Sequence, residues 1–329
     1  MRVLFVLPYR HPRPGGAQWT THWLARELGR RGHAPAVLAA EGGDEVEGEL
    51  GYPVFTAARA ADRFGPDVVV VTAHHDDDQG PAWTEGALAA AAPLPTVLYV
   101  HDAGARAAAV ASRGRASAIA AVSQFVAAAL GDAGVEAEVV PPIVDPVHYR
   151  TATTREVVLF VTPIGYKGLP TALMLAEARP DIRFAFVAGG RMAEGELRAL
   201  REETGRLANV EIRAASRDPS AIYGDARVVL VPSVHPEAWG RVVTEAQASG
   251  IPALASAVGG LPDAVGAGGV LVSPEAGDEG WRAALAELWD DREAYKRYAE
   301  AAQRAGRRPD VTPEAVGDRF ERLLAGTCG

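Results

Sequence analysis

The sequence of 329 residues contains one cysteine, Cys328, so an intrachain disulfide is impossible. It also lacks an apolar stretch of the length that a signal peptide or a membrane-spanning helix needs, because Met1-Arg2 leads directly into the short run VLFVLP. The 33 basic residues are outnumbered by 42 acidic ones, and the net charge of −9 provides no general field for a polyanion. We therefore expect a soluble cytoplasmic protein without integral membrane association and without a nucleic-acid partner.

Lysine is nearly absent as well, since only two of the 33 basic residues, Lys167 and Lys296, are lysines. Each of the two is therefore worth inspecting. No short-period repeat is present, and 35 glycines plus 23 prolines stay below the fraction typical of low-complexity chains. The chain is longer than the roughly 250–300 residues at which a single core stops growing. The composition therefore predicts a folded globular protein of two domains.

Short apolar or β-branched runs alternate with helical patterns along nearly the whole chain, which is typical of parallel α/β architecture. The pattern predicts strands at 2–7, 35–39, 67–71, 95–100, 118–122 and 137–140, and again at 157–161, 183–188, 209–213, 227–231, 252–256 and 269–272. It predicts helices near 17–31, 85–91, 105–112 and 124–131, between the strands of the second half, and over 278–325 with a break at 307–310.

A proline-rich joint at residues 140–146 separates the two halves, and its prolines predict a semi-rigid hinge. We expect an N-terminal Rossmann-like domain at 1–145, a second one at 146–312, and a final helix at 313–329 that crosses back to the first domain. Two such units facing each other would form an interdomain cleft at the carboxyl ends of both sheets, where sheets of this kind bind ligands.

The strongest functional pattern is PSVHPEAWGRVVTEA, residues 232–246, which follows a predicted buried strand. A helix is expected to begin near Gly240, and the free amides around Ala238 to Arg241 would form an anion site. Glu237 and Glu245 flank these amides. With helical rise throughout, at about 1.5 Å per residue, roughly 12 Å would separate them. That distance matches the reach from a hexose to a ribose across a diphosphate, although a helix-terminal carboxylate and an exposed helix glutamate would give the same spacing.

With its flanks PS, WG and EA…SGIP, this segment resembles the retaining glycosyltransferases of family 4, which have the GT-B fold of two facing Rossmann-like domains. The resemblance extends over roughly residues 1–275. It implies that Gly15 and Gly16 form a glycine-rich loop against the donor phosphate or the acceptor, with an ordinary turn as the alternative. It also implies that His101, at a strand end, meets the donor sugar, and that Lys167 of GYKG neutralises the departing diphosphate. A structural histidine and a solvated loop lysine are the alternatives for these two.

One position departs from the family pattern, because Thr162 stands where an arginine usually precedes the lysine by five residues. Either the diphosphate is held with one cation fewer, or Arg241 or another arginine substitutes for the missing one. The segment 259–263 matches the GG-x-x-E loop of the family with Asp263 in place of the glutamate.

Five potential metal ligands follow one another in His74-His75-Asp76-Asp77-Asp78. Metal ions need ligands that converge on one point, and consecutive loop residues rarely supply more than two or three of them. We therefore expect a solvated or acceptor-contacting loop. The resemblance likewise implies chemistry without a metal or other cofactor, because lysine and helix amides take the charge of the leaving group.

Together these patterns predict a retaining, metal-independent glycosyltransferase that moves a hexose from a nucleoside diphosphate sugar, with a UDP-sugar favoured, to a hydroxyl of a small soluble acceptor such as a sugar or natural product. The expected catalytic residues are His101, Lys167 and Glu237. The expected donor-binding residues are Gly15, Gly16, Ala238, Trp239, Gly240, Arg241 and Glu245. A non-catalytic nucleotide-sugar-binding GT-B protein and a nucleotide-sugar epimerase remain alternatives. A nicotinamide dehydrogenase is the least favoured class, since G-x-G-x-x-G does not follow the first strand.

Overall fold

The computed structural model describes residues 1–9, 15–41, 50–56, 63–73, 80–189 and 192–328. Two compact units make up the chain, unit 1 with Met1–Ile143 and Asp310–Gly329, and unit 2 with Val144–Pro309. The predicted boundaries, 145/146 and 312/313, lie two and three residues after these positions.

Unit 1 is built on a seven-stranded sheet with the strand order β3-β2-β1-β4-β5-β6-β7, in which all neighbours are parallel. Its strands are β1 (Arg2–Tyr9), β2 (Ala34–Glu41), β3 (Val54–Phe55), β4 (Val68–Ala73), β5 (Thr96–Val100), β6 (Ala118–Ala121) and β7 (Glu138–Val139). Its helices are α1 (Gly16–Arg30), α4 (Gly80–Ala91), the short η1 (Ala103–Ala105), α5 (Arg106–Ala111), α6 (Gln124–Gly131), η4 (Pro309–Val311), which begins at the junction with unit 2, and α15 (Pro313–Cys328).

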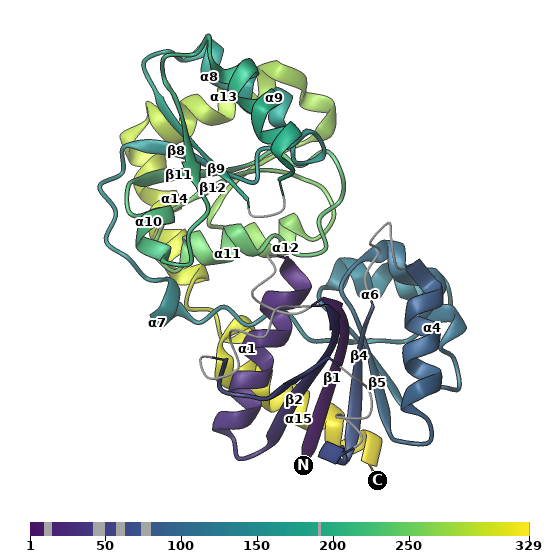
Figure 1. Cartoon of the computed structure of the whole chain (residues 1–329). Helices are drawn as coiled ribbons and strands as arrows, with labels where there is room; N and C mark the ends of the chain where they lie inside the picture. The colour runs from purple at the N-terminus through teal and green to yellow at the C-terminus, as the bar shows by residue number, and fades with distance from the viewer. Residues whose placement is uncertain (10–14, 42–49, 57–62, 74–79, 190–191, 329) are drawn as a thin grey trace. The chain divides into compact units, whose positions relative to one another are not determined.

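Every residue of β4 and β5 is buried, which explains their largely apolar sequences and requires helices on both faces of the sheet. Figure 1 shows α1 and α15 together on one face and α4 on the other. Helix α15 follows unit 2 in the sequence but packs into the core of unit 1, where the ring of Phe320 stacks on that of Phe5 at 6.3 Å. At its rim Arg31 donates hydrogen bonds to Asp318 at 2.6 Å and Glu321 at 2.7 Å.

Unit 2 contains a six-stranded parallel sheet with the order β10-β9-β8-β11-β12-β13. Its strands are β8 (Val157–Val161), β9 (Arg183–Ala188), β10 (Val210–Ala214), β11 (Ala226–Val231), β12 (Ala253–Ser256) and β13 (Gly269–Val272). Its helices are α7 (Pro146–Tyr149), η2 (Gly165–Lys167), α8 (Leu169–Ala178), α9 (Glu194–Thr204), α10 (Pro219–Tyr223), α11 (Arg241–Gln247), α12 (Leu261–Val265), η3 (Pro274–Ala276), α13 (Gly277–Trp289) and α14 (Arg292–Ala305).

Three elements differ from the sequence-based expectation. Strand β3 was not predicted, because two residues are too few to show a periodicity. Helix α7 occupies the end of the proline-rich joint, where Asp145 caps it by accepting from the amide of Val147 at 2.8 Å. The long C-terminal helical region is also broken before α14, since Asp291 accepts from two amides of a new first turn.

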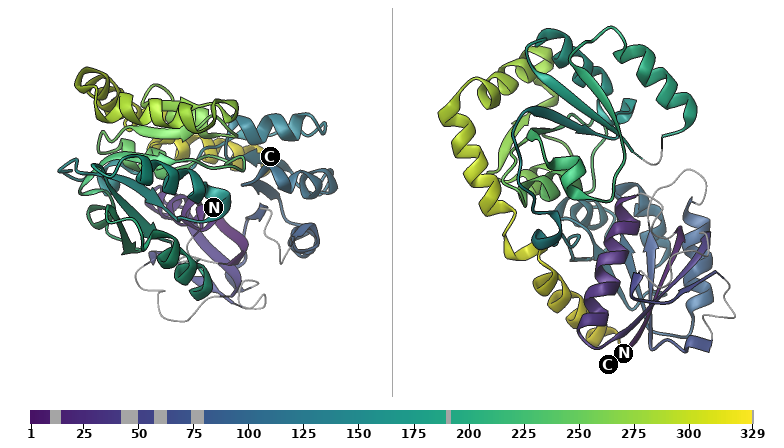
Figure 2. Two further views of the ribbon diagram at one scale, coloured as in Figure 1. Left: turned by 90° about the horizontal axis from the view of Figure 1, so that it is seen from above. Right: turned by 60° about the vertical axis from the view of Figure 1, so that its left-hand side comes forward.

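All twelve predicted strands are present, each within two residues of its expected bounds, and both sheets are parallel. This confirms the α/β class with two Rossmann-like units (Figures 1 and 2). The cleft between the units stays a prediction. Across the described ranges, no helix is both long and apolar enough to cross a membrane.

Candidate active site

The predicted donor residues of unit 2 gather at one edge of its sheet. Lys167 follows β8, Glu237 follows β11, and the Gly259-Gly260 pair follows β12. These three strands are neighbours and parallel, so their carboxyl ends lie at the same edge. The chain reverses its direction of strand addition between β8 and β11, and parallel sheets bind ligands at such a switch point.

Lys167 ends the short 3₁₀ helix η2 and is held in place by Gly168. This glycine has φ +88°, and a Cβ there would overlap the carbonyl oxygen of Pro232, so no other residue fits without rearrangement. The carbonyl of Tyr166 accepts from the amide of Val234 at 3.0 Å. The loop after β8 and the loop after β11 are therefore fixed against each other by backbone contacts.

This arrangement brings Lys167 and Glu237 together. The ammonium Nζ donates to Glu237 Oε1 at 2.5 Å, and the hydroxyl of Ser233 donates to the same oxygen at 2.6 Å. The side chains remain 28% and 16% exposed, respectively, so both charges are accessible to a ligand. The structure thus places a cation for a phosphate beside a carboxylate that can accept from sugar hydroxyls.

The backbone after Glu237 offers donors. In the described part of the chain, the amides of Ala238, Trp239 and Gly240 have no hydrogen-bond acceptor. The carbonyl of Glu237 is fixed by the amide of Gly260 at 2.7 Å, which anchors the segment to the loop after β12. Free amides that lead into a helix favour a bound anion, so this segment is suited to a diphosphate.

The prediction of helical spacing between Glu237 and Glu245 is wrong. Residues 237–240 are not helical, and Gly240 has φ +96°, so helical rise applies only from Arg241, where α11 begins. The estimate of roughly 12 Å across Glu237 and Glu245 therefore has no structural basis. The cause is the left-handed residue before the helix, which the sequence marks only as a glycine.

Glu245 lies one turn into α11 and has two partners. Its Oε2 accepts from the hydroxyl of Tyr223 at 2.8 Å and its Oε1 from Nε of Arg241 at 3.2 Å. Nη2 of Arg241 also donates to the hydroxyl of Tyr149 at 3.3 Å. Burial, reinforced by the neighbouring carboxylate of Glu245, raises the pKa of Tyr223 well above its usual range, so the phenol stays a donor.

The guanidinium of Arg241 is therefore buried among partners within unit 2. Its side chain is only 10% exposed and lies between Glu245 and Tyr149. Burial opposes its charge, but Tyr149 and Glu245 raise the pKa of the guanidinium above its usual value. This favours the first of the two alternatives for Thr162, a diphosphate held with one cation fewer, because Arg241 is already engaged.

Thr162 itself has an unusual backbone, with φ +60° directly before Pro163. A β-branched residue rarely adopts this conformation, and such a residue costs on the order of 1–3 kcal/mol. Gly189 permits it, because a Cβ at that position would meet the Thr162 side chain at 2.5 Å.

Trp239 is buried, with 6% of its surface exposed, and the guanidinium of Arg308 lies 5.1 Å from the centre of its ring. The indole thus packs within unit 2, and the part of Trp239 available for the predicted donor contact is its backbone amide.

The remaining predicted site residues lie in unit 1, also after parallel strands. His101 follows β5, is 9% exposed, and its ring packs on that of Tyr99 at 4.2 Å. Gly15 and Gly16 open α1, and a Cβ on Gly16 would meet no described atom within 4 Å. Among the described residues, crowding therefore does not explain a glycine at position 16.

Sequence reasoning missed several polar residues at these edges. Ser233 and Tyr223 contact the two glutamates, and only the serine was marked, as part of the PS pair. Gln18, in the first turn of α1, is 1% exposed, and its amide nitrogen and oxygen have no partner among the described residues. The signal in the sequence that could have identified Gln18 is its position two residues after Gly16.

The run His74–Asp78 lies outside the described residues, so the expectation for it is untested. Across the described ranges, no three His, Cys, Asp or Glu side chains are placed to hold a metal ion.

Comparison with known families gives two adjacent matches. Residues 14–148 match the family described as "Glycosyltransferase Family 4", and residues 146–305 match "Glycosyl transferases group 1". Among curated proteins, the chain is 36% identical over 184 residues to D-inositol 3-phosphate glycosyltransferase of Mycolicibacterium smegmatis, covering 53% of this chain and 42% of that protein. It is 49% identical over 94 residues to the same enzyme of Corynebacterium glutamicum, covering 26% of this chain and 21% of that protein. The two matches therefore span less than half of the relatives' own length.

Solved structures resemble the whole chain. Anabaena HepE in complex with UDP-glucose superposes with a TM-score of 0.81 at 20% identity over 99% of both chains. AviGT4, a glycosyltransferase involved in avilamycin A biosynthesis, superposes with a TM-score of 0.66 at 24% identity, covering 99% of this chain and 98% of that one. At these identities the superpositions establish the fold.

Proposed function

Because the chain belongs to the family 4 type of glycosyltransferases and has the GT-B fold, we propose that it transfers a hexose, with retention of configuration, from a nucleoside diphosphate sugar to a hydroxyl of a small soluble acceptor. One observation carries the proposal. At the switch point of unit 2, the Lys167 ammonium and the Glu237 carboxylate lie 2.5 Å apart, beside three amides that have no acceptor among the described residues. This set pairs donors for a diphosphate with an acceptor for sugar hydroxyls.

In the proposed reaction the acceptor oxygen attacks the anomeric carbon from the face that the leaving phosphate occupies. The bond between that carbon and the phosphate oxygen breaks as the new glycosidic bond forms, and the acceptor proton passes to the phosphate. Lys167 and the amides of Ala238, Trp239 and Gly240 stabilise the charge that develops on the diphosphate. Glu237 holds the hexose hydroxyls, and Glu245 accepts from the ribose through lone pairs left free by Tyr223 and Arg241.

We assign the unit 1 residues to the sugar and acceptor side. His101 would contact the donor sugar, and Gly15 and Gly16 would let the ligand approach the backbone at the start of α1. Gln18 would contribute its buried amide, which has no partner among the described residues, to an acceptor hydroxyl, since an unpaired buried amide costs about 1–3 kcal/mol that a ligand can recover.

The relatives support a soluble acceptor and a uridine donor. Two curated relatives are D-inositol 3-phosphate glycosyltransferases, and HepE was solved in complex with UDP-glucose. We propose a UDP-sugar donor, a small hydroxylated acceptor of the sugar or natural-product class, and a cytoplasmic location. Thermal-shift titration with UDP, GDP, dTDP and ADP, followed by their sugars, tests the proposal. We expect one nucleoside diphosphate and its sugar to raise the melting temperature of the protein. If none of the nucleotides raises it, donor binding is contradicted.

Thr162→Arg is expected to tighten the binding of free nucleoside diphosphate about tenfold or more, the scale of one added charge-assisted contact. The exchange also removes a β-branched residue from φ +60°, so it should not destabilise unit 2. Calorimetric titration with the nucleoside diphosphate measures the effect, with Thr162→Gln as the uncharged control of similar reach. Equal affinities for wild type and Thr162→Arg would indicate that another cation already fills the position.

Chelation is expected to leave transfer activity within about twofold, because Lys167 and the free amides provide the charge stabilisation that a metal would otherwise supply. Initial rates with and without EDTA, at fixed donor and acceptor, check this. Complete loss of activity with EDTA, restored by Mg²⁺ or Mn²⁺, would overturn metal independence and direct attention to residues 74–78.

A further inference from the structure

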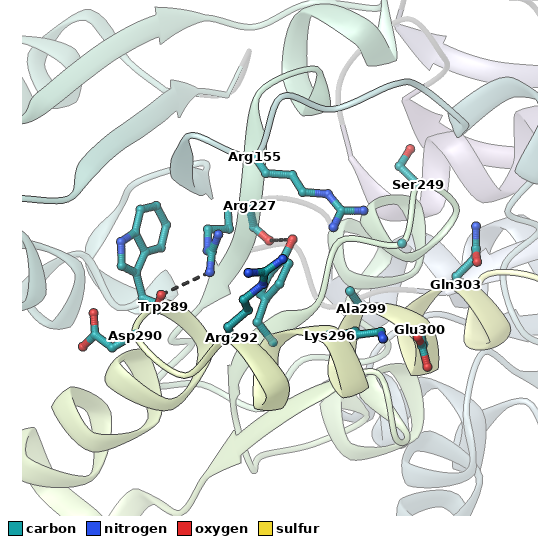
Figure 3. A pocket seen from close by; sticks show the side chains of 12 residues that line it. Arg155, Arg227, Ser249, Trp289, Asp290, Arg292, Lys296, Ala299, Glu300 and Gln303 are labelled. Atoms are coloured by element: carbon teal, nitrogen blue, oxygen red, sulfur yellow. Dashed lines mark hydrogen bonds between the residues drawn. The ribbon is translucent and has the colours of Figure 1, made fainter.

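A second concave site lies at the opposite edge of the sheet in unit 2. A cavity of about 610 Å³ opens between the segment before β8, the start of β11 and helix α14. Figure 3 shows Arg155 above the cavity, Arg227 beside it, and Arg292 and Lys296 rising from α14. Cavities of this size accommodate small-molecule ligands.

The cavity concentrates positive charge in a chain whose net charge is −9. Four cationic side chains line it, Arg155, Arg227, Arg292 and Lys296. None of these four side chains forms an ion pair with a carboxylate of the described residues. Four uncompensated cations around one cavity are costly unless water or an anion solvates them.

The two acidic residues of the rim do not balance this charge. Asp290 pairs with Arg179, which donates to both of its carboxylate oxygens at 2.8 and 2.9 Å and also pairs with Asp181. The other acidic residue of the rim, Glu300, forms no ion pair with any described residue. With four cations and two carboxylates, the residues that line the cavity carry a net charge of +2.

The aromatic residues of the cavity are engaged with cations. The guanidinium of Arg227 lies 4.1 Å from the ring centre of Tyr295 and 5.0 Å from that of Trp289, and its Nη2 donates to the carbonyl of Trp289 at 3.1 Å. Arg155 lies 5.6 Å from the ring centre of Tyr295. The rings thus orient arginines. Tyr295 is only 6% exposed, and Trp289 packs partly buried against the core of unit 2, so neither ring is freely exposed for stacking on a nucleobase.

We propose that this cavity is a binding site for a compact anion that carries two or more phosphate groups and no nucleobase. Guanidinium groups match phosphate oxygens with parallel hydrogen bonds, and Lys296 adds a point charge. Four cations suffice to contact two phosphate groups. Lys296 is the second of the two lysines in the chain, and the glycosyl-transfer site does not use it.

The site is separate from the proposed donor site. Arg155 precedes β8 and Arg227 is the second residue of β11, whereas Lys167 and Glu237 follow the carboxyl ends of the same two strands. Strand β8 has five residues, so at about 3.3 Å per residue roughly 16 Å of sheet lies between the two edges. A compact anion cannot reach both, and the inference does not depend on glycosyl transfer.

Calorimetric titration of the full chain with fructose 1,6-bisphosphate tests the proposal, with fructose as the uncharged control. The double variant Arg292→Ala/Lys296→Ala removes two exposed charges of α14 and is expected to weaken binding about tenfold or more. The matched variant Arg297→Ala/Arg304→Ala removes the same charge from α14 outside the cavity and should bind like wild type. Lys167→Ala should also leave this binding unchanged.

Binding of the bisphosphate by wild type, lost only in the cavity variant, supports the site. Three results would overturn it: no binding at millimolar concentration, equal weakening in both double variants, or loss of binding in Lys167→Ala. The last result would assign the bisphosphate to the donor site. Circular dichroism of each variant verifies that α14 remains folded.

Discussion

Replacing Glu237 by alanine is expected to lower kcat/KM by about 100-fold or more, while free nucleoside diphosphate binds nearly as well as to wild type. The loss is the scale of a charged contact that strengthens in the transition state. Binding of the nucleotide should persist because Glu237 is assigned to the hexose. Removing the carboxylate also releases the Lys167 ammonium from its 2.5 Å contact, which leaves that cation available to the diphosphate.

The second glutamate provides the contrast. Glu245 is assigned to the ribose, which free nucleotide and nucleotide sugar share, so its replacement should weaken both ligands by a similar factor. Glu245→Gln is the appropriate change, because alanine would leave the buried Arg241 and Tyr223 without their acceptor. Calorimetry with nucleoside diphosphate, together with kinetics of both variants, measures the two effects. Glu202→Ala, an exposed carboxylate of α9, serves as the control.

Two outcomes would contradict these assignments. Equal loss of nucleotide binding in Glu237→Ala and Glu245→Gln would show that the carboxylates do not divide the donor between them. Normal transfer by both variants would refute the glycosyltransferase mechanism at this edge of unit 2.

Lys167→Ala is expected to weaken nucleoside diphosphate binding and to slow transfer, with kcat lower by roughly 100- to 1,000-fold, the typical effect of removing one preorganised group that stabilises transition-state charge. Both parameters should fall because the lysine meets the diphosphate before and during its departure. Arg201→Ala removes an equal charge from α9, where the side chain is 60% exposed, and should leave both parameters unchanged. Unchanged kinetics in Lys167→Ala would remove this residue from the site.

The strands of both sheets were predictable because parallel strands buried on both faces form nearly continuous apolar runs, as in β4 and β5. The pairing of Lys167 with Glu237 was not. It depends on Gly168 approaching Pro232 and on the backbone contact between Tyr166 and Val234, and both join segments about 65 residues apart. Composition and periodicity are local signals and do not specify such contacts.

The distance between Glu237 and Glu245 could not be predicted for a related reason. A helix can be predicted from a pattern, but its first residue depends on backbone geometry, here the left-handed Gly240. The contacts of Arg241 and Glu245 could not be predicted either, because Tyr149, which accepts from Arg241, comes from α7, and Tyr223, which donates to Glu245, comes from α10. The cationic cavity likewise draws Arg155, Arg227 and Lys296 from three separate segments.

The central claim is most directly tested by following UDP-, GDP-, dTDP- and ADP-glucose with the protein by proton NMR, without added acceptor. Because water can replace the acceptor in a front-face reaction, wild type is predicted to release nucleoside diphosphate slowly from one donor and to produce glucose first as the α anomer. Glu237→Ala should release none on the same timescale. Release of the β anomer would contradict retention, inversion at C2 of the sugar would indicate an epimerase, and four intact donors after prolonged incubation would contradict the proposed activity.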